Sequence, residues 1–104
     1  MAVATITQFR INPGRNADFN AQVAEAKGHH ERLGGRVRVW QATAAGPNTG
    51  VVSYVIEHKD LAAFAAFSDK VATDAQWLAF AAKVFTANPS GTLVSGVLAT
   101  EITP

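Results

Sequence analysis

The sequence lacks cysteine and is poor in charge. Without cysteine, the 104-residue chain has no disulfide, no thiolate nucleophile and no zinc or iron–sulfur site built on sulfur. Charged residues make up 16% of the chain, whereas soluble domains average about a quarter. The basic and acidic residues nearly balance at a net charge of +1, which gives no basic surface for nucleic acid or anionic membranes. We therefore expect no nucleic-acid partner and no membrane partner.

Long hydrophobic runs are also missing. No segment approaches the roughly 18 apolar residues that a membrane-spanning helix needs. Residues 1–11 alternate apolar and polar side chains, which is typical of a strand and not of a signal peptide. We expect a cytoplasmic, soluble protein. Domains usually contain roughly 100 to 200 residues, so residues 1–104 are expected to form a single domain.

The spacing of apolar residues predicts the order βαββαβ. Turn formers and capping residues separate the segments, including Asn12-Pro13-Gly14, Gly34-Gly35 and Asn88-Pro89-Ser90-Gly91. The predicted strands are about 2–11, 36–43, 50–58 and 92–102, and the predicted helices are about 15–32 and 61–85, with a break at Thr73-Asp74. This order predicts the α+β class and a ferredoxin-like fold, with a four-stranded antiparallel sheet and the helices on one face.

The other face of such a sheet has no helix over it. Strand 50–58 carries apolar side chains on both faces, so the uncovered face is expected to be apolar as well. An apolar surface of this kind needs a cover, and a two-fold homodimer is the commonest assembly of soluble chains. We therefore expect a homodimer that forms through the sheet faces.

Short motifs spread over residues 2–102 support a family assignment. They are Phe9-Arg10-Ile11-Asn12-Pro13-Gly14 with Phe19, Val39-Trp40, Gly46-Pro47-Asn48-Thr49-Gly50 with Tyr54, Asp60-Leu61, Lys70, and Asp74 before Trp77. Together they resemble the dimeric α+β-barrel superfamily, in particular its NIPSNAP-like and antibiotic-biosynthesis-monooxygenase-like members. The resemblance implies a homodimer whose two sheets enclose a barrel. In the members that are enzymes, small-molecule pockets lie between the sheet and the helices.

Two strands carry a candidate ligand site. If partner residues in the hairpin have numbers with an even sum, Arg38 lies opposite His58 and Trp40 opposite Ile56, with Tyr54 on the same face. A cation, two aromatic rings and an imidazole would then line a pocket for a planar, partly anionic ligand. The alternative is that Trp40 and Tyr54 are aromatic residues of the dimer core and that Arg38 forms an ion pair at the interface.

The histidines and Trp77 complete the set of candidates. His30 follows Phe19, Val23 and Ala26 along the apolar stripe of helix 15–32, so it points inward, either into a pocket or as a structural core residue. His29 and His30 point about 100° apart on a helix and cannot hold one metal ion together. His58 is expected at a solvated strand end, and Trp77 is expected to be a packing residue.

The sequence supports two hypotheses about function. The first is small-molecule binding in a pocket between sheet and helices, with His30, Arg38, Trp40, Tyr54 and His58 as candidate lining residues. The alternative is a cofactor-independent monooxygenase that acts on a planar aromatic or quinol-like substrate, with His30 or His58 as base and Arg38 stabilising the anion. The sequence identifies no catalytic residue, and we expect neither a metal nor a cofactor.

Overall fold

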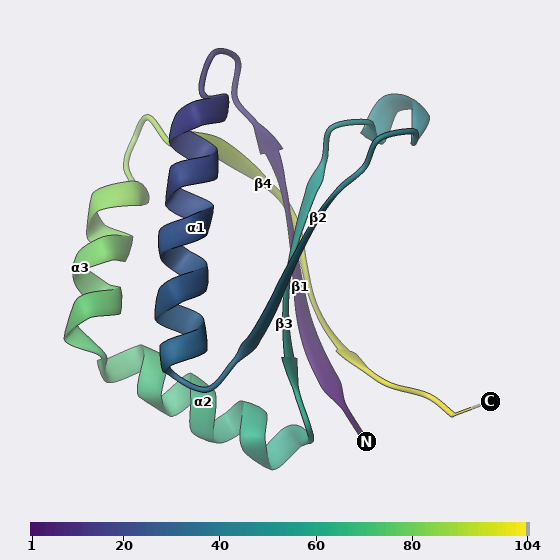
Figure 1. Ribbon diagram of the computed structural model, residues 1–104, viewed down its shortest axis with the longest axis vertical. Helices are drawn as coiled ribbons and strands as arrows, with labels where there is room; N and C mark the ends of the chain where they lie inside the picture. Colours follow the sequence, from purple (N-terminus) through teal and green to yellow (C-terminus); the bar gives the residue numbers. More distant parts are fainter. Residues whose placement is uncertain (104) are drawn as a thin grey trace.

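An antiparallel sheet of four strands organises the protein (Figure 1). The computed structural model describes residues 1–103. The strands lie in the order β2-β3-β1-β4, and their bounds are β1 Val3–Ile11, β2 Arg36–Gln41, β3 Val52–His58 and β4 Gly91–Thr100. Helices α1 (Asn16–Arg32), α2 (Leu61–Thr73) and α3 (Ala75–Val84) all lie on one side of the sheet. The predicted ferredoxin-like α+β fold is confirmed.

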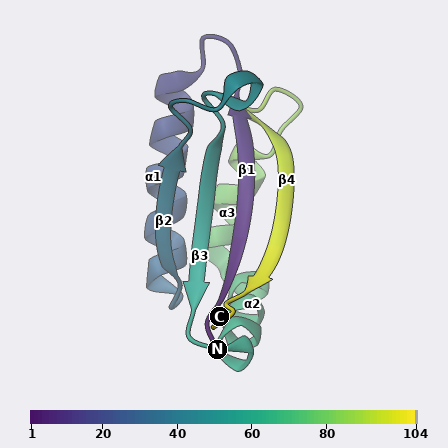
Figure 2. The same cartoon turned by 90° about the vertical axis from the view of Figure 1, so that its right-hand side faces the viewer.

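The other face of the sheet carries no helix within residues 1–103 (Figure 2). All four strands can be seen on this open face, with the helices behind them. Here β2 and β3 continue into a hairpin whose tip contains the short 3-10 helix η1, Gly46–Asn48. The fold therefore has two layers, and the open face remains available to a further layer.

The register of the β2–β3 hairpin differs from the predicted one. Arg38 pairs with Val55 and Trp40 pairs with Ser53. The residue numbers of paired residues therefore add up to an odd number, and the predicted register, in which the sum is even, was wrong. In the observed register the apolar side chains of β2, such as Val39, share a face with Tyr54. The even register would have placed the arginines of β2 on that buried face instead, because a shift of one residue moves every side chain to the other side.

The observed register separates the predicted site residues. Side chains of β3 alternate in burial, and those of Val52, Tyr54, Ile56 and His58 face the helices. Arg38 and Trp40 point to the open face. The core consequently contains Val37, Tyr54 and Ile56 of the sheet, packed against Phe67 of α2.

Helix α1 brings its apolar stripe onto this core. Phe19 and His30 are buried at its two ends. The chain leaves the helix through Gly34, whose φ of 103° lies in the left-handed region that favours glycine. The next residue, Gly35, passes so close to the sheet that an added Cβ would lie 2.6 Å from Ile56. This close approach sets how tightly the end of α1 packs against β3.

Helices α2 and α3 each begin at an aspartate. The Asp60 side chain accepts a hydrogen bond from the backbone N–H of Ala63 at 2.8 Å, and Asp74 accepts one from Trp77 at 2.8 Å. These are N-cap interactions, which satisfy backbone donors that a helix leaves free at its start. The predicted break at Thr73-Asp74 is confirmed, and it turns the chain so that α3 lies beside α1 (Figure 1).

Candidate functional site

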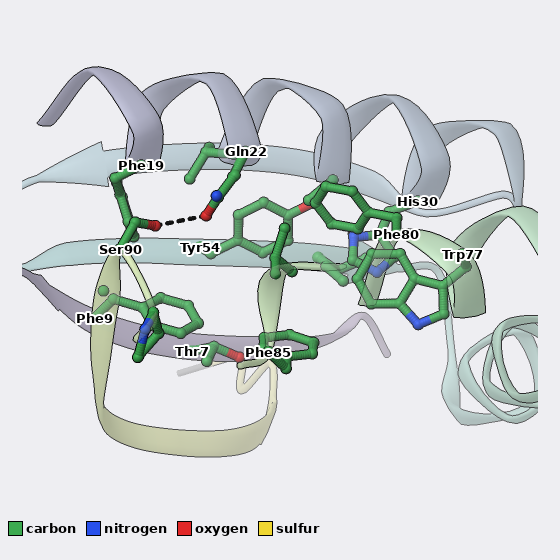
Figure 3. Close-up of a pocket in the computed structure, with 16 residues that line it drawn as sticks. Thr7, Phe9, Phe19, Gln22, His30, Tyr54, Trp77, Phe80, Phe85 and Ser90 are labelled. Carbon is green, nitrogen blue, oxygen red and sulfur yellow. Dashed lines mark hydrogen bonds between the residues drawn. The ribbon is translucent and has the colours of Figure 1, made fainter. Parts of the chain in front are cut away.

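A cavity of about 300 Å³ lies between the sheet and helices α1 and α3. Its walls are mainly apolar and come from four parts of the chain: β1, α1, β3, and the segment from α3 to the start of β4 (Figure 3). The aromatic lining residues are Phe9, Phe19, Tyr54, Trp77, Phe80 and Phe85. Apolar cavities of about 150 Å³ bind benzene, so this one has room for a compound of about two rings.

The cavity contains polar groups but no charged side chain. No Lys, Arg, Asp or Glu of residues 1–103 lines it. Its polar lining residues are Thr7, Gln22, His30, Tyr54 and Ser90. A few polar groups on an apolar wall are typical of small-molecule sites, because they orient a ligand that apolar contact holds.

His30 and Tyr54 form the central polar pair of the cavity. His30 lies in the last turn of α1, Tyr54 lies on β3, and both are buried. The His30 Nδ1 atom and the Tyr54 hydroxyl oxygen are 2.6 Å apart, which is a short hydrogen bond. The Trp77 ring packs on the imidazole with a centroid distance of 4.3 Å. One hydrogen bond and one ring contact therefore fix the imidazole.

Both members of this pair are uncharged at neutral pH. Burial, and to a smaller extent charge repulsion from the neighbouring His29, lowers the pKa of His30 from 6.5 to about 4. Burial raises the pKa of Tyr54, and the negative charge of Glu31 acts in the same direction. The pair thus offers hydrogen bonds without a net charge.

A second polar pair closes the other end of the cavity. The Ser90 hydroxyl donates a hydrogen bond to Gln22 Oε1 at 2.6 Å, and Figure 3 shows this bond beside Phe19, away from Trp77. The Asn12 side chain holds the same loop by donating to the Pro89 carbonyl at 2.8 Å. The predicted turn formers around residues 12–14 and 88–91 therefore meet, and Pro89, Ser90 and Gly91 of the second segment line the cavity.

Of the five predicted lining residues, the structure brings only His30 and Tyr54 together in this cavity. Arg38 and Trp40 lie on the open face, where the guanidinium carbon of Arg38 is 5.0 Å from the centre of the Trp40 ring. The Trp40 side chain is 57% exposed. The prediction of one shared face was wrong because it depended on the even hairpin register.

His58 is a separate case. It lies on the helix-covered face outside the cavity lining, packed against Phe64 and Phe67 with ring centroid distances of 5.5 and 4.7 Å. It is 6% exposed and its Nε2 atom is buried without a hydrogen-bond partner, so the predicted solvated strand end was wrong. Helix α2 covers this end of β3, and the resulting burial lowers the pKa of His58.

Several lining residues escaped the sequence analysis. Trp77 does pack, as expected, but its packing partner is His30 and it forms a wall of the cavity. One signal for Trp77 was present in the sequence, namely Asp74 three residues before it. An N-cap aspartate fixes where a helix begins and therefore the direction of the side chains in its first turn. Gln22 and Ser90 are far apart in the sequence, and no local pattern indicated that they would meet.

The described residues hold neither a metal-binding cluster nor a helix that could span a membrane. Within residues 1–103, no group of three or more His, Asp or Glu side chains is arranged to hold a metal ion. None of the described helices is both long enough and apolar enough to cross a membrane.

Comparisons with solved structures identify the fold. An uncharacterized NIPSNAP domain protein from Burkholderia xenovorans superposes with a TM-score of 0.72 at 19% identity, covering 98% of this chain and 95% of that one. A NIPSNAP family protein from Agrobacterium tumefaciens gives 0.68 at 17% identity, covering 95% and 90%. A putative antibiotic biosynthesis monooxygenase from Bordetella bronchiseptica gives 0.62 at 19% identity, covering 98% of each chain.

At these identities the structural matches show a shared fold and nothing more about activity. A search of curated proteins found no significant similarity to this sequence. The family model named NIPSNAP matches residues 4–90, a range that includes β2, β3, all of β1 except Val3, all three helices and nearly all of the cavity lining. The chain therefore belongs to the NIPSNAP family.

Proposed function

We propose that the protein binds a small, uncharged and mainly apolar ring compound in the cavity between its sheet and its helices. The observation that carries this proposal is the uncharged His30–Tyr54 pair on the wall of a mainly apolar cavity rich in aromatic side chains. Aromatic walls favour a flat apolar ligand, and one hydrogen-bonding pair is enough to orient it. The position of Arg38 on the other face of the sheet removes the support for an anionic ligand.

Cofactor-independent oxygenation is the second candidate, and the site supports it less well. Such an enzyme needs a base that takes a proton from the substrate and holds it. The pKa of His30 is lowered to about 4, so this imidazole holds a proton poorly at neutral pH. The second predicted base, His58, lies outside the cavity lining. Binding without chemistry is therefore the function that these residues favour.

We also propose that the open face of the sheet packs against the same face of a second copy. Trp40 and Val97 project from it and are 57% and 53% exposed. Apolar side chains on a broad sheet face are costly in water, and a two-fold contact between identical faces covers both at once. In such a dimer the cavity lies on the far side of each sheet, so each subunit has its own complete site.

An NMR titration tests ligand binding directly. The chain has two tryptophans, of which Trp77 lines the cavity and Trp40 lies on the open face. In a 1H–15N correlation spectrum, the two indole N–H signals can be assigned with the Trp40→Phe variant. We expect 1-acetonaphthone, a two-ring ketone, to shift the Trp77 signal in a saturable way and to leave the Trp40 signal in place.

Two results would contradict this proposal. One is the absence of any saturable change at Trp77 with 1-acetonaphthone and with the matched alcohol 1-naphthol. The other is an equal shift of both indole signals, which would indicate unspecific binding to exposed apolar surface. The Trp77→Phe variant serves as control, because its remaining signal from Trp40 should not respond to either compound.

A further inference from the structure

We infer that His30 presents its Nε2–H to the cavity as a hydrogen-bond donor, so that the site selects ketones and quinones over phenols and carboxylates of the same shape. The inference rests on the proposed ligand-binding function and adds the chemical class of the ligand. It follows from the position of two hydrogen atoms in the His30–Tyr54 pair.

The pair has two ways to share its hydrogen atoms. A neutral imidazole carries one N–H, on either Nδ1 or Nε2. In the first arrangement the Tyr54 hydroxyl donates to His30 Nδ1, and the imidazole hydrogen is on Nε2. In the second arrangement His30 Nδ1–H donates to the Tyr54 oxygen, and the hydroxyl hydrogen of Tyr54 needs another acceptor.

The donors and acceptors of the pair decide between these arrangements. The one side-chain hydrogen-bond partner of Tyr54 within residues 1–103 is His30. In the second arrangement the hydroxyl hydrogen has no acceptor there, and the Nε2 lone pair of the imidazole is unused as well. In the first arrangement the hydroxyl hydrogen is bonded to an imidazole nitrogen, which is a stronger acceptor than a phenol oxygen, and the one hydrogen without a protein partner is on Nε2. The first arrangement is therefore favoured, and it leaves the hydrogen on Nε2.

The Nε2 atom is open to a ligand. No group of residues 1–103 forms a hydrogen bond with it, yet it is not among the polar atoms that are sealed from solvent, unlike His58 Nε2. His30 is itself a lining residue, and Trp77 packs on its ring without offering an acceptor. A ligand in the cavity can therefore accept the hydrogen bond that the protein leaves unmade.

This arrangement separates ligands by their polar group. A ketone or quinone oxygen accepts a hydrogen bond from Nε2–H. A phenol of the same size offers a hydroxyl donor, and its oxygen is a poorer acceptor than a carbonyl. A carboxylate would have to give up its hydration shell on entering a cavity that has no charged lining residue to compensate, and this desolvation is strongly unfavourable.

The first experiment measures the tautomer of the free protein. A long-range 1H–15N spectrum of the imidazoles distinguishes a hydrogen on Nε2 from one on Nδ1, and the His30→Gln variant identifies which signals belong to His30. We expect the Nε2–H form in the wild type at neutral pH. A predominant Nδ1–H form would overturn the inference, whether or not any ligand binds.

The second experiment compares three naphthalenes with the same ring system. We expect 1-acetonaphthone to bind about tenfold more tightly than 1-naphthol, which corresponds to one hydrogen bond, and 1-naphthoate to bind most weakly, as followed by the Trp77 indole signal. Tyr54→Phe removes the hydroxyl that fixes the tautomer, so the ratio between ketone and phenol should fall towards one. Ser53 is next to Tyr54 in β3, and its side chain points to the opposite face of the sheet. Ser53→Ala should therefore keep the wild-type ratio of ketone to phenol affinity.

The outcomes separate this inference from the proposed function. Equal affinities for ketone and phenol would overturn the inference and leave ligand binding standing. Failure of all three compounds to bind would overturn the proposed function and with it the selectivity. If Tyr54→Phe does not fold, the ratio of affinities in the wild type and the tautomer measurement still test the inference.

Discussion

Arg32 at the end of α1 holds Asp74 at the start of α3 through two hydrogen bonds, of 2.8 and 2.9 Å. The same carboxylate caps α3 by accepting from the backbone N–H of Trp77. Because Trp77 packs on His30, this ion pair fixes the distance between two walls of the cavity. A charge pair at the edge of the site thus contributes to the shape of an uncharged cavity.

Replacing Asp74 should weaken both stability and ligand binding. Asp74→Asn keeps a capping side chain but loses the charge that pairs with Arg32, so we expect a lower midpoint of thermal unfolding and a weaker Trp77 response to 1-acetonaphthone. Asp60→Asn is the matched control, since Asp60 caps α2 and forms no ion pair within residues 1–103. Equal effects of both substitutions would show that the ion pair contributes nothing beyond capping.

The Arg32–Asp74 pair also predicts an acid dependence. The Arg32 hydrogen bonds lower the pKa of Asp74 well below its ordinary 3.8 in the folded state. A lowered carboxyl pKa stabilises the fold above the unfolded pKa, and this contribution is lost as the pH falls below about 4. The stability difference between wild type and Asp74→Asn should therefore narrow from about pH 5 to about pH 2.5, as measured by thermal unfolding.

His30 should produce a separate pH dependence at higher pH. Its pKa is about 4 in the folded protein and 6.5 when unperturbed, so the unfolded chain binds the proton more readily and stability falls as the pH decreases from about 6.5 to 4. Allowing for solvent that reaches the ring through the cavity, we expect a loss of about 2 kcal/mol. Urea unfolding at several pH values between about 6.5 and 4 measures this loss of unfolding free energy.

A histidine variant provides the control for this effect. His30→Gln should flatten the slope between about pH 6.5 and pH 4, because the titrating group is gone. A smaller slope of the same sign should remain, since burial also lowers the pKa of His58. An unchanged slope in His30→Gln would show that His30 is not the main source of the pH dependence.

Two glycines near the end of α1 should respond oppositely to alanine. A Cβ on Gly35 would lie 2.6 Å from the Ile56 side chain and 3.0 Å from the Phe67 ring, so Gly35→Ala should destabilise by about 1 to 3 kcal/mol. Gly28, inside α1, has open space around the added Cβ, and Gly28→Ala should stabilise by about 0.5 to 1 kcal/mol. Chemical denaturation compares the two, and a stable Gly35→Ala variant would contradict the close packing of α1 on β3.

The proposed dimer should depend on the open face alone. Val97→Lys places a charge in the middle of the proposed interface, so we expect a dimeric wild type and a monomeric variant in analytical ultracentrifugation. Leu61 is 60% exposed and belongs to α2, on the helix side of the sheet, so Leu61→Lys should remain dimeric. A monomeric wild type, or a dimer that survives Val97→Lys, would contradict the proposed interface.

The secondary structure and the fold class could be predicted from the sequence. Local signals determined them: the turn formers at 12–14 and 88–91, the aspartate caps at Asp60 and Asp74, and the stripe that turns His30 inward. Each of these signals acts within one segment of the chain. A helix or strand period is a property of neighbouring residues, so it can be read without knowing what the segment packs against.

Only the tertiary structure decided which candidates share a site. Pairing of Arg38 with Val55 instead of His58 placed Arg38 and Trp40 on one face of the sheet and Tyr54 on the other. This register depends on how the loop between β2 and β3 closes, and a change of one residue reverses the side of every residue in the strand. Likewise, Trp77 meets His30 because α3 docks beside α1, and contacts between distant segments leave no periodic pattern in the sequence.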